Sequence, residues 1–350
     1  MRATIKTIAE LAGVSKSTVD RALKGQAGVH PDTRERILKA AEQCGYQINV
    51  AGRALRRQRS PLRIAVVFCW RRVFDCQIRD GIRAAEREFG TLGIQLDFFD
   101  LQTGDWEEQL RVLQSLRSDG VHGIILKAVD HPEIVKMVDE LERSGIKIAT
   151  ISTDLPQSHR TYFVGQNYNQ AGRVAGSLME MLLGKNGNVT ILQESTEYQV
   201  YWEREAGFVQ YFHEQNSRIT LQTVLCKEEM SPQNYPQILD YLRHTPDIDG
   251  IFCTGFSYLY AAQALLDTGR TGIRLIGYDV YTDTVPLMKK HALDFVITQN
   301  PFRQGYEGIS GLFHRLVSNT SYSSNTVYTP VTTFNYEALE GMQPEMLSQL

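Results

Sequence analysis

Cysteine and histidine are sparse in this sequence, and their spacing indicates neither a disulfide framework nor a metal site. The five cysteines, Cys44, Cys69, Cys76, Cys226 and Cys253, are odd in number and include no CxxC pair, so we predict reduced thiols that pack in the interior. The eight histidines show no HExxH spacing, and no GxGxxG, GxxxxGK[ST] or GxSxG segment occurs. We therefore expect no metal, no cofactor, no catalytic residues and no enzymatic activity.

Long apolar runs are also missing. The sequence has no stretch of about 18 apolar residues that could span a bilayer, and its first residues have a helical pattern instead of a signal peptide. We expect a cytoplasmic protein that is neither exported nor inserted in a membrane. A chain of 350 residues has room for a small head and two larger lobes.

Basic charge is concentrated at the start of the chain. Residues 1–60 hold 12 Lys and Arg against 5 Asp and Glu, a net charge of +7, whereas residues 61–350 have a net charge of −10. A polyanion is the expected partner of the basic segment, with an affinity that falls steeply as salt rises.

Residues 5–25 have the pattern of a helix-turn-helix. A first helix with apolar residues at helical spacing ends at Gly13-Val14, and Ser15 is placed to cap a second helix over residues 16–23. The inner faces are predicted to comprise Ile5, Ile8, Ala9, Ala12, Val19, Ala22 and Leu23.

The outer face of the second helix carries Lys16, Ser17 and Arg21. Side chains of these types can reach base edges in the major groove of DNA, while Thr18 is placed to reach a phosphate. The alternative is an ordinary helical hairpin with a solvated basic face.

A third helix is predicted from Pro31 to Cys44, with Ile37, Leu38 and Ala41 on its inner face. Residues 49–60 then carry four arginines around one apolar residue, Leu55. An isolated short helix of this composition is marginal in water, so we expect its folding to be coupled to DNA binding. The alternative is a basic linker that only separates two domains.

From residue 62 onward, short apolar runs alternate with amphipathic segments of helical period. Such alternation predicts parallel sheets with helices on both faces, and two successive series predict two lobes. The expected strands are residues 63–68, 95–99, 123–126, 147–151, 188–192, 220–225, 250–253, 274–278, 295–298 and about 327–332. The expected helices are residues 80–89, 106–116, 132–143, 169–183, 202–214, 232–243, 258–266, 285–291 and a last one from residue 304.

Polar and aromatic residues follow many of these strands, at the end of the sheet where α/β folds bind ligands. Rings can cover the apolar faces of a sugar while amides, carboxylates and an arginine pair with its hydroxyls, so a neutral polyhydroxylated ligand suits this set. Asp279 could instead cap the next helix, and Arg204 could be a surface ion-pair residue. The positions are Trp70, Phe74, Ser152, Thr153, Asp154, Gln193, Glu194, Asp279, Gln299 and Asn300.

These motifs together resemble the lactose-repressor (LacI/GalR) family of transcriptional regulators. The specific segments are TIAELAGVSKSTVDRAL, VHPDTRERILKAAEQCGY and an NxxxRxL hinge; VGxxNxxAGRxAG, RxxGF and IGYD also resemble periplasmic pentose- and hexose-binding proteins. The resemblance covers nearly the whole chain. It implies a helix-turn-helix domain over residues 1–48, a hinge over 49–60 and a two-lobed, periplasmic-binding-protein-like sensor over 61–350. The first lobe is expected at about 62–161 plus 299–326, and the second at about 162–298 plus 327–345.

The resemblance also implies roles for single residues. Lys16, Ser17 and Arg21 fall on base-reading positions, and Leu55 on a leucine wedged into the minor groove. Phosphate contacts fall on Thr4, Thr18, Thr33 and Arg34, and the hinge adds Asn49, Arg53 and Arg56 to the DNA-binding set. Phe74 matches an aromatic residue that stacks on sugar, Arg204 and Asp279 match hydroxyl-binding groups, and Gln299 matches a further polar contact. Trp202 could add a ring or pack in the core, so the predicted ligand set is Trp70, Phe74, Thr153, Asp154, Trp202, Arg204, Asp279 and Gln299.

Several positions depart from the family pattern. Asp20 stands where the family usually has Ser, and Gly52 weakens the hinge helix by about 1 kcal/mol relative to alanine. Thr254-Gly255-Phe256 stands where an Asn-Asp pair often binds sugar, and Asn167-Tyr168 replaces an Asp-Asn pair. Neither the operator sequence nor the sugar is therefore transferred from the family.

The expected function is a ligand-responsive, sequence-specific regulator, most simply a repressor, that controls uptake or catabolism of a sugar or polyol. We expect a homodimer on a palindromic DNA operator, with the effector acting either as an inducer or as a corepressor. The alternative is a sugar-binding protein of transport type, which would share the sensor but would have no use for the basic head.

Overall fold

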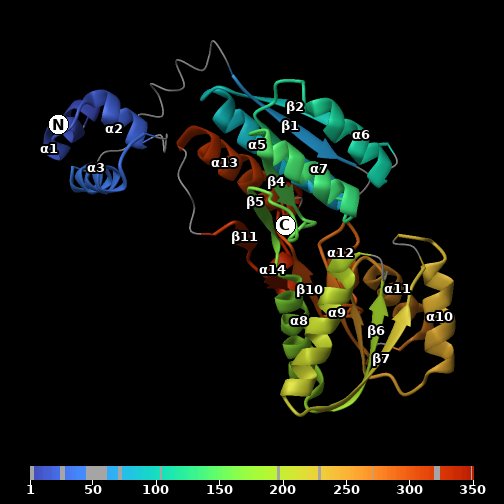
Figure 1. Ribbon diagram of the computed structural model, residues 1–350. Helices are drawn as coiled ribbons and strands as arrows, with labels where there is room; N and C mark the ends of the chain where they lie inside the picture. Colours follow the sequence, from blue (N-terminus) through green and yellow to red (C-terminus); the bar gives the residue numbers. More distant parts are fainter. Residues whose placement is uncertain are drawn as a thin grey trace. The chain divides into compact units, whose positions relative to one another are not determined.

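The computed structural model (Figure 1) describes residues 4–23, 28–44, 61–69, 73–102, 105–194, 198–227, 230–270, 272–318, 324–347 and 349–350. Predicted site residues outside these ranges are Asn49, Arg53, Leu55, Arg56 and Trp70. The chain divides into two units, one of residues 1–69, 82–163 and 306–326 and the other of residues 70–81, 164–305 and 327–350.

The N-terminal head consists of three helices: α1 (Ile5–Ala12), α2 (Lys16–Leu23) and α3 (Pro31–Gln43). The Thr4 hydroxyl caps α1 by accepting a hydrogen bond from the Thr7 N–H (3.3 Å), and Gly13 ends the helix with a φ of 64°. Ser15 caps α2 through the N–H of Thr18 (3.1 Å). The predicted helix-turn-helix boundaries are confirmed.

The core of the head is one apolar cluster from all three helices: Ile8, Ala9, Ala12, Val19, Ala22, Ile37, Ala40 and Ala41. The prediction that Leu38 belongs to it is wrong, because this side chain is 50% exposed. Successive helical residues are rotated by about 100°, so Leu38 lies beside the buried stripe and Ala40 takes the inner position.

The first sheet has six strands in the order β11-β5-β4-β3-β1-β2, and it lies in the first unit except for residues 164–166 and 327–329, which the division assigns to the second. The strands are β1 (Leu62–Phe68), β2 (Ile94–Asp100), β3 (Gly123–Leu126), β4 (Lys147–Ile151), β5 (Tyr162–Gln166) and β11 (Thr326–Thr329). Helices α6 (Trp106–Leu116) and α7 (Pro132–Arg143) share an apolar core with one face of the sheet. Helices α5 (Val73–Gly90) and α13 (Pro301–Ser318) pack on each other through Phe89 and Phe313, whose ring centroids are 4.9 Å apart.

The second unit has a sheet of the order β12-β10-β9-β8-β6-β7. Its strands are β6 (Asn186–Gln193), β7 (Arg218–Leu225), β8 (Gly250–Cys253), β9 (Arg274–Tyr278), β10 (Phe295–Thr298) and β12 (Thr332–Phe334). The sheet is parallel from β7 to β10, and β12 is antiparallel to β10.

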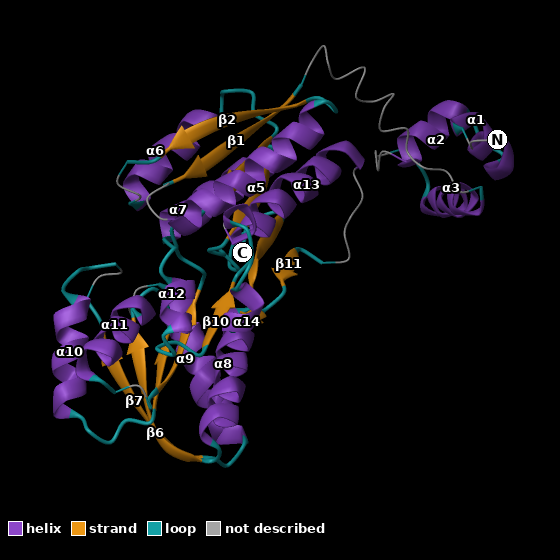
Figure 2. Cartoon of the chain, turned by 180° about the vertical axis from the view of Figure 1, so that it is seen from behind, coloured by secondary structure: helices purple, strands orange, loops and turns teal. Residues whose placement is uncertain are grey.

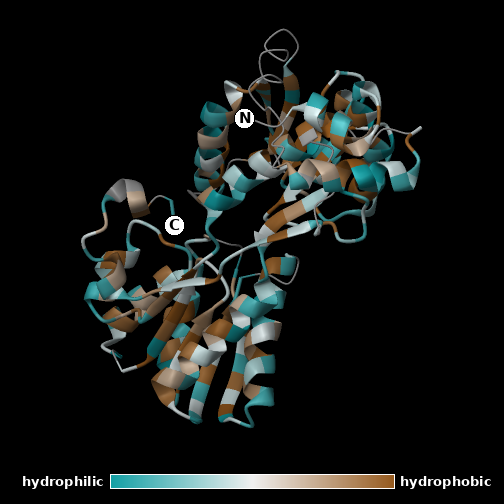
Figure 3. Ribbon diagram, turned by 90° about the vertical axis from the view of Figure 1, so that its left-hand side faces the viewer, coloured by the Kyte–Doolittle hydropathy of each residue, from teal (hydrophilic) through white to brown (hydrophobic). Residues whose placement is uncertain are grey.

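Helices cover both faces of this second sheet. One apolar core joins it to α8 (Tyr168–Leu183) and α9 (Gln199–Glu214), and another joins it to α10 (Asn234–His244), α11 (Tyr258–Thr268) and α12 (Thr284–Lys289). Figure 2 shows these helix groups on opposite sides of the strands, and in Figure 3 the strands between them are largely hydrophobic in colour. Two short helices, α14 (Tyr336–Leu339) and α15 (Pro344–Leu347), complete the elements. The predicted two-lobed α/β fold class with a helical head is confirmed.

Two details of the strand prediction are wrong. Strand β5 was not predicted, because a five-residue run that contains Gly165 and Gln166 has no distinctive period without its neighbours. The single strand expected at about 327–332 is two strands, β11 in the first sheet and β12 in the second. Pro330 separates them, since proline has no N–H for a sheet ladder and its ring interrupts a strand.

Candidate functional site

Polar residues follow four neighbouring strands of the second sheet. Glu194 comes after β6, Thr254 after β8, Asp279 after β9 and Gln299 after β10, and all four are buried. Because these strands are parallel, their carboxyl ends lie along one edge of the sheet. We refer to these four residues with Arg204 of α9 as the strand-end cluster.

Arg204 is the largest fully buried side chain in the described chain, with 1% of it exposed. Its Nη1 donates a hydrogen bond to the Thr254 carbonyl oxygen (2.6 Å). Among the described residues, none accepts a hydrogen bond from its Nε or Nη2. The alternative that Arg204 is a surface ion-pair residue is therefore wrong.

Aromatic rings stabilise the Arg204 guanidinium in place of a carboxylate. Its central carbon lies 3.7 Å from the ring centroid of Tyr278 and 5.4 Å from that of Tyr168, distances at which a cation is attracted to the face of a ring. Burial raises the pKa of the Tyr278 hydroxyl, and although the nearby Arg204 charge acts in the opposite direction, the net shift is upward. Tyr278 therefore remains a neutral hydroxyl at physiological pH.

A close crossing of α8 and α9 holds Arg204 in place. A Cβ added at Gly172 of α8 would lie 2.0 Å from the Arg204 carbonyl oxygen, and one added at Gly207 of α9 would lie 2.0 Å from the Asn169 carbonyl oxygen. Only glycine permits such backbone approach. The AGR and RxxGF motifs therefore have a structural cause, because their glycines seat the helix that carries Arg204.

Asp279 and Gln299 are bonded to each other at the ends of adjacent strands. The Gln299 side-chain amide donates to one Asp279 carboxylate oxygen (2.8 Å), and the Gln299 backbone N–H donates to the other (3.4 Å). Asp279 has a φ of 65°, in the left-handed region that is uncommon for a residue with a side chain. Asp279 does not cap α12, whose N-cap residue is Asp283.

The strand-end cluster combines hydrogen-bond donors and acceptors. Two N–H groups of Arg204 lack acceptors among the described residues, while Asp279 contributes carboxylate oxygens. Buried polar groups without partners are costly unless a ligand or water satisfies them. No group of three His, Cys, Asp or Glu in the described ranges is placed to hold a metal ion. The chemistry suits hydroxyl groups, which donate and accept.

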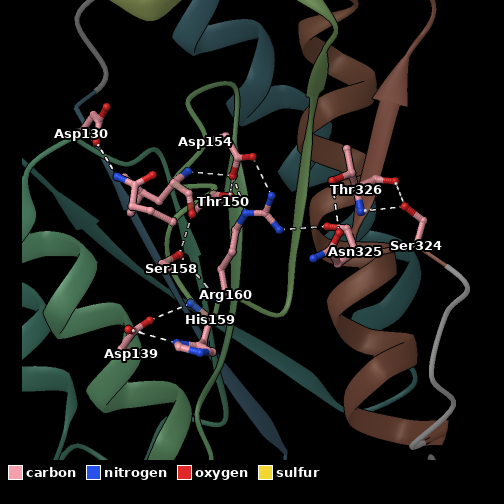
Figure 4. Close-up of polar contacts among 12 residues, drawn as sticks. Asp130, Asp139, Thr150, Asp154, Ser158, His159, Arg160, Ser324, Asn325 and Thr326 are labelled. Atoms are coloured by element: carbon pink, nitrogen blue, oxygen red, sulfur yellow. Dashed lines mark hydrogen bonds and ion pairs between the residues drawn. The ribbon is translucent and has the colours of Figure 1, made fainter.

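Asp154 of the first unit is bonded in a different way (Figure 4). Both of its carboxylate oxygens accept hydrogen bonds from Arg160, and one also accepts from the Thr150 hydroxyl (3.1 Å) and the Leu155 N–H (2.7 Å). Arg160 in turn donates to the Asn325 carbonyl oxygen (3.0 Å), next to β11. Asp154 therefore fixes the segment after β4, and this bonding argues against the predicted ligand role.

The other predicted ligand residues are dispersed. Trp202 lies two residues before Arg204 and so on the opposite side of α9, where it is 46% exposed beside Glu205, Ala206 and Val209. The alternative that Trp202 packs in the core is therefore wrong, while its predicted role as a ring in the ligand site stays a prediction. Phe74 is buried in the first turn of α5, and Thr153 is half-buried after β4. Trp70 lies outside the described residues.

The described part of the head presents its predicted base-reading residues to solvent. Lys16, Ser17 and Arg21 are exposed on α2. The Thr4 and Thr18 hydroxyls take part in the helix caps, so their predicted phosphate contacts would add to an existing role. Thr33 and Arg34 are half-buried in the first turn of α3. The hinge residues Asn49, Arg53, Leu55 and Arg56 lie outside the described ranges.

Three residues near Arg204 were not assigned from the sequence. Tyr168 and Tyr278 read as core positions of an amphipathic helix and a buried strand, and neither pattern reveals a nearby cation. Glu194 was noted only for its place after a strand. Its burial, at 1% exposed, is the signal that sequence periodicity could not supply.

Comparisons with known proteins identify both parts of the chain. Residues 71–316 match the family model described as periplasmic binding protein domain, and residues 4–49 match the model of bacterial regulatory proteins, lacI family. No helix in the described ranges is long and apolar enough to cross a membrane.

Individual relatives agree with this division. The chain is 24% identical to the ribose operon repressor of Bacillus subtilis (strain 168), over 79% of this chain and 81% of the relative. It is 31% identical to the HTH-type transcriptional regulator PtxS of Pseudomonas plecoglossicida, over 44% of this chain and 46% of the relative. A solved structure of a putative LacI transcriptional regulator from Bacteroides fragilis superimposes with a TM-score of 0.71 at 19% identity, covering 81% of this chain and all of that one. The chain therefore belongs to the periplasmic binding protein domain family and carries, ahead of that domain, a DNA-binding domain of the lacI family of bacterial regulatory proteins.

Proposed function

We propose that this protein is a repressor whose binding to a DNA operator is controlled by a sugar or related polyol. The observation that carries the proposal is the buried Arg204, which has two N–H groups without acceptors among the described residues, next to an Asp279–Gln299 pair. This arrangement occurs in a chain whose α2 exposes Lys16, Ser17 and Arg21.

The chemistry of the second unit supports a hydroxylated effector. Nε and Nη2 of Arg204 would donate to ligand hydroxyl oxygens, and Asp279 would accept from ligand hydroxyls. The neutral Tyr278 hydroxyl could take either role. One relative is a ribose operon repressor, a name that connects it with a sugar, and no enzymatic step is needed for such a response.

The head is proposed to act on double-stranded DNA as part of a homodimer on a palindrome. Leu55 would insert at the centre of the operator while Arg53 and Arg56 contact its backbone. Effector binding would shift the population of the DNA-competent form.

Selection of random duplexes by the purified full chain, with and without a pooled sugar library, tests the proposal. A palindrome enriched without sugar and lost with it would identify an inducer, and one enriched only with sugar would identify a corepressor. Either result supports the proposal. Enrichment that is the same under both conditions would contradict sugar control, and no enrichment under either would contradict operator binding.

A Leu55→Ala variant tests the DNA side separately. It should lose specific operator affinity and keep the salt-dependent affinity for random duplex, because the arginines still contact phosphates. Unchanged specific affinity would contradict the wedge role of Leu55.

A further inference from the structure

Glu194 is a buried carboxylate at the ligand-facing edge of the second sheet, and nothing so far assigns it a role. Its side chain is 1% exposed, although glutamate is rarely buried without a structural or functional reason. Its backbone N–H donates to the Thr254 hydroxyl (3.2 Å), and Thr254 also accepts from Arg204 through its carbonyl oxygen (2.6 Å). Glu194 and Arg204 are therefore both hydrogen-bonded to Thr254.

The surroundings of Glu194 include a hydrogen-bond donor that suits a carboxylate. One carboxylate oxygen accepts a hydrogen bond from the backbone N–H of Ser257, which is the N-cap residue of the 11-residue helix α11. Hydrogen bonds to a carboxylate and the positive end of a helix both stabilise negative charge.

Gly255 makes room for this carboxylate. A Cβ at that position would lie 2.8 Å from Cγ of Glu194 and 2.9 Å from Cε1 of Tyr201, closer than side chains normally approach. With a residue larger than glycine at position 255, the Glu194 side chain could not keep its present position. The glycine and the glutamate therefore form one arrangement, in which the polar group comes from the end of β6 instead of from residue 255.

The charge of the strand-end cluster then determines what it can bind. The strand-end cluster contains two carboxyl groups, Glu194 and Asp279, and one guanidinium, Arg204. A phosphate or carboxylate on the ligand would be brought next to two buried negative charges, which is unfavourable where the effective dielectric constant is low. Uncharged hydroxyls would instead donate to the carboxylates and accept from Arg204.

We infer that Glu194 is a specificity-determining contact for the effector, and that with Asp279 it restricts the site to uncharged polyhydroxylated ligands and excludes phosphorylated and acidic sugars. This inference rests on the proposed function, since it assigns the chemical class of the same effector.

Calorimetric titration of the full chain tests it with five- and six-carbon sugars and polyols, each paired with its phosphate ester or sugar acid. The wild-type protein should bind a neutral member about 100-fold more tightly than its anionic counterpart.

A Glu194→Gln variant keeps an oxygen that can accept from Ser257 but loses the charge. The affinity of this variant for the neutral ligand should fall about tenfold, because a charged acceptor is replaced by a neutral one. The ratio of its affinities for the neutral and the anionic ligand should fall from about 100 to about ten. A Glu214→Gln variant is the matched control and should behave as wild type, since Glu214 pairs with Arg173 at the C-terminal end of α9, ten residues after Arg204.

The outcomes separate this inference from the proposed function. Tightest binding of an anionic member, or unchanged affinity and preference in Glu194→Gln, would overturn the inference and leave a sugar-responsive regulator in place. Binding of no member of either class would overturn the sugar effector itself, and the role of Glu194 with it.

Discussion

The two sheets of this protein place acidic residues after their strands and use them differently. In the first unit, Asp154 follows β4, and its carboxylate is bonded to Arg160, a hydroxyl and a backbone N–H. In the second unit, Asp279 follows β9, and its carboxylate accepts hydrogen bonds from the side-chain amide and the backbone N–H of Gln299, which are neutral donors. The nearby cation, Arg204, has no ion pair with a described carboxylate within 4 Å and keeps two donors without acceptors in the described chain.

This difference shows what a position after a strand does and does not reveal. The topology brings such residues to the edge where ligands bind, but the partners of each charge decide its role. A carboxylate saturated by an arginine of its own unit stabilises the loop. An arginine held by rings and one carbonyl, with donors left over, is suited to a ligand.

Breaking the Arg160–Asp154 pair should give the largest effect on stability. The Arg160 side chain is 6% exposed and that of Asp154 is 17% exposed, so an Arg160→Ala change would leave a largely buried carboxylate without its counter-charge. We expect the free energy of unfolding to fall by about 3–5 kcal/mol, measured by urea denaturation. An Arg173→Ala change at an exposed pair is the control and should cost well under about 1 kcal/mol. Equal effects of the two changes would contradict a structural role for Asp154.

Replacing Arg204 should instead act on effector binding. An Arg204→Ala variant should keep operator binding but lose effector response, with affinity for the effector falling about 100-fold, because a charged donor of two hydrogen bonds is removed. Operator binding titrated against effector measures both quantities. Unfolding free energy is measured in parallel, because truncating this buried side chain also leaves a cavity beside Tyr168 and Tyr278; the variant must still be folded at the temperature of the binding measurement. A variant that still responds fully to effector would remove Arg204 from the site.

Separating α8 from α9 should affect stability and effector binding together. A Gly207→Ala change puts a methyl group 2.0 Å from the Asn169 carbonyl oxygen, so the helices must move apart, at a cost of about 1–3 kcal/mol. Effector affinity should fall as well because Arg204 moves with α9. Gly90→Ala, where a Cβ meets nothing within 4 Å, is the matched control and should change neither quantity. Retained stability in Gly207→Ala would show that the crossing tolerates a wider spacing.

Much of the fold could be predicted because its signals are local. Strands β3, β8 and β9 and helices α6 and α7 have the predicted boundaries, since apolar runs flanked by polar residues mark them directly. Strand β5 and the split at Pro330 depend on which sheet each segment joins, and hydrophobic period alone does not encode that.

The site residues were likewise predicted only in part. Motifs pointed to Arg204 and Asp279, whereas the Arg160 contact of Asp154 and the outward side of Trp202 depend on tertiary packing and helix rotation.

The smallest expected effect on stability concerns Asp139, a second acidic residue of the first unit that is bonded within its own unit. Burial would raise the pKa of Asp139, but hydrogen bonds from the backbone N–H (2.7 Å) and the ring of His159, with the positive charges of His159 and Arg143, hold it below its usual value. A lowered native pKa contributes stability that is present above the unfolded-state value, about 3.9, and is lost as the pH falls through the native value. Since the carboxylate is partly exposed (21%), Asp139→Asn should reduce the free energy of unfolding by at most about 1 kcal/mol at neutral pH. The difference between the two proteins in urea denaturation should shrink between about pH 5 and pH 3. If the difference in unfolding free energy between the two proteins stays constant over that pH range, the charge of Asp139 contributes nothing to stability.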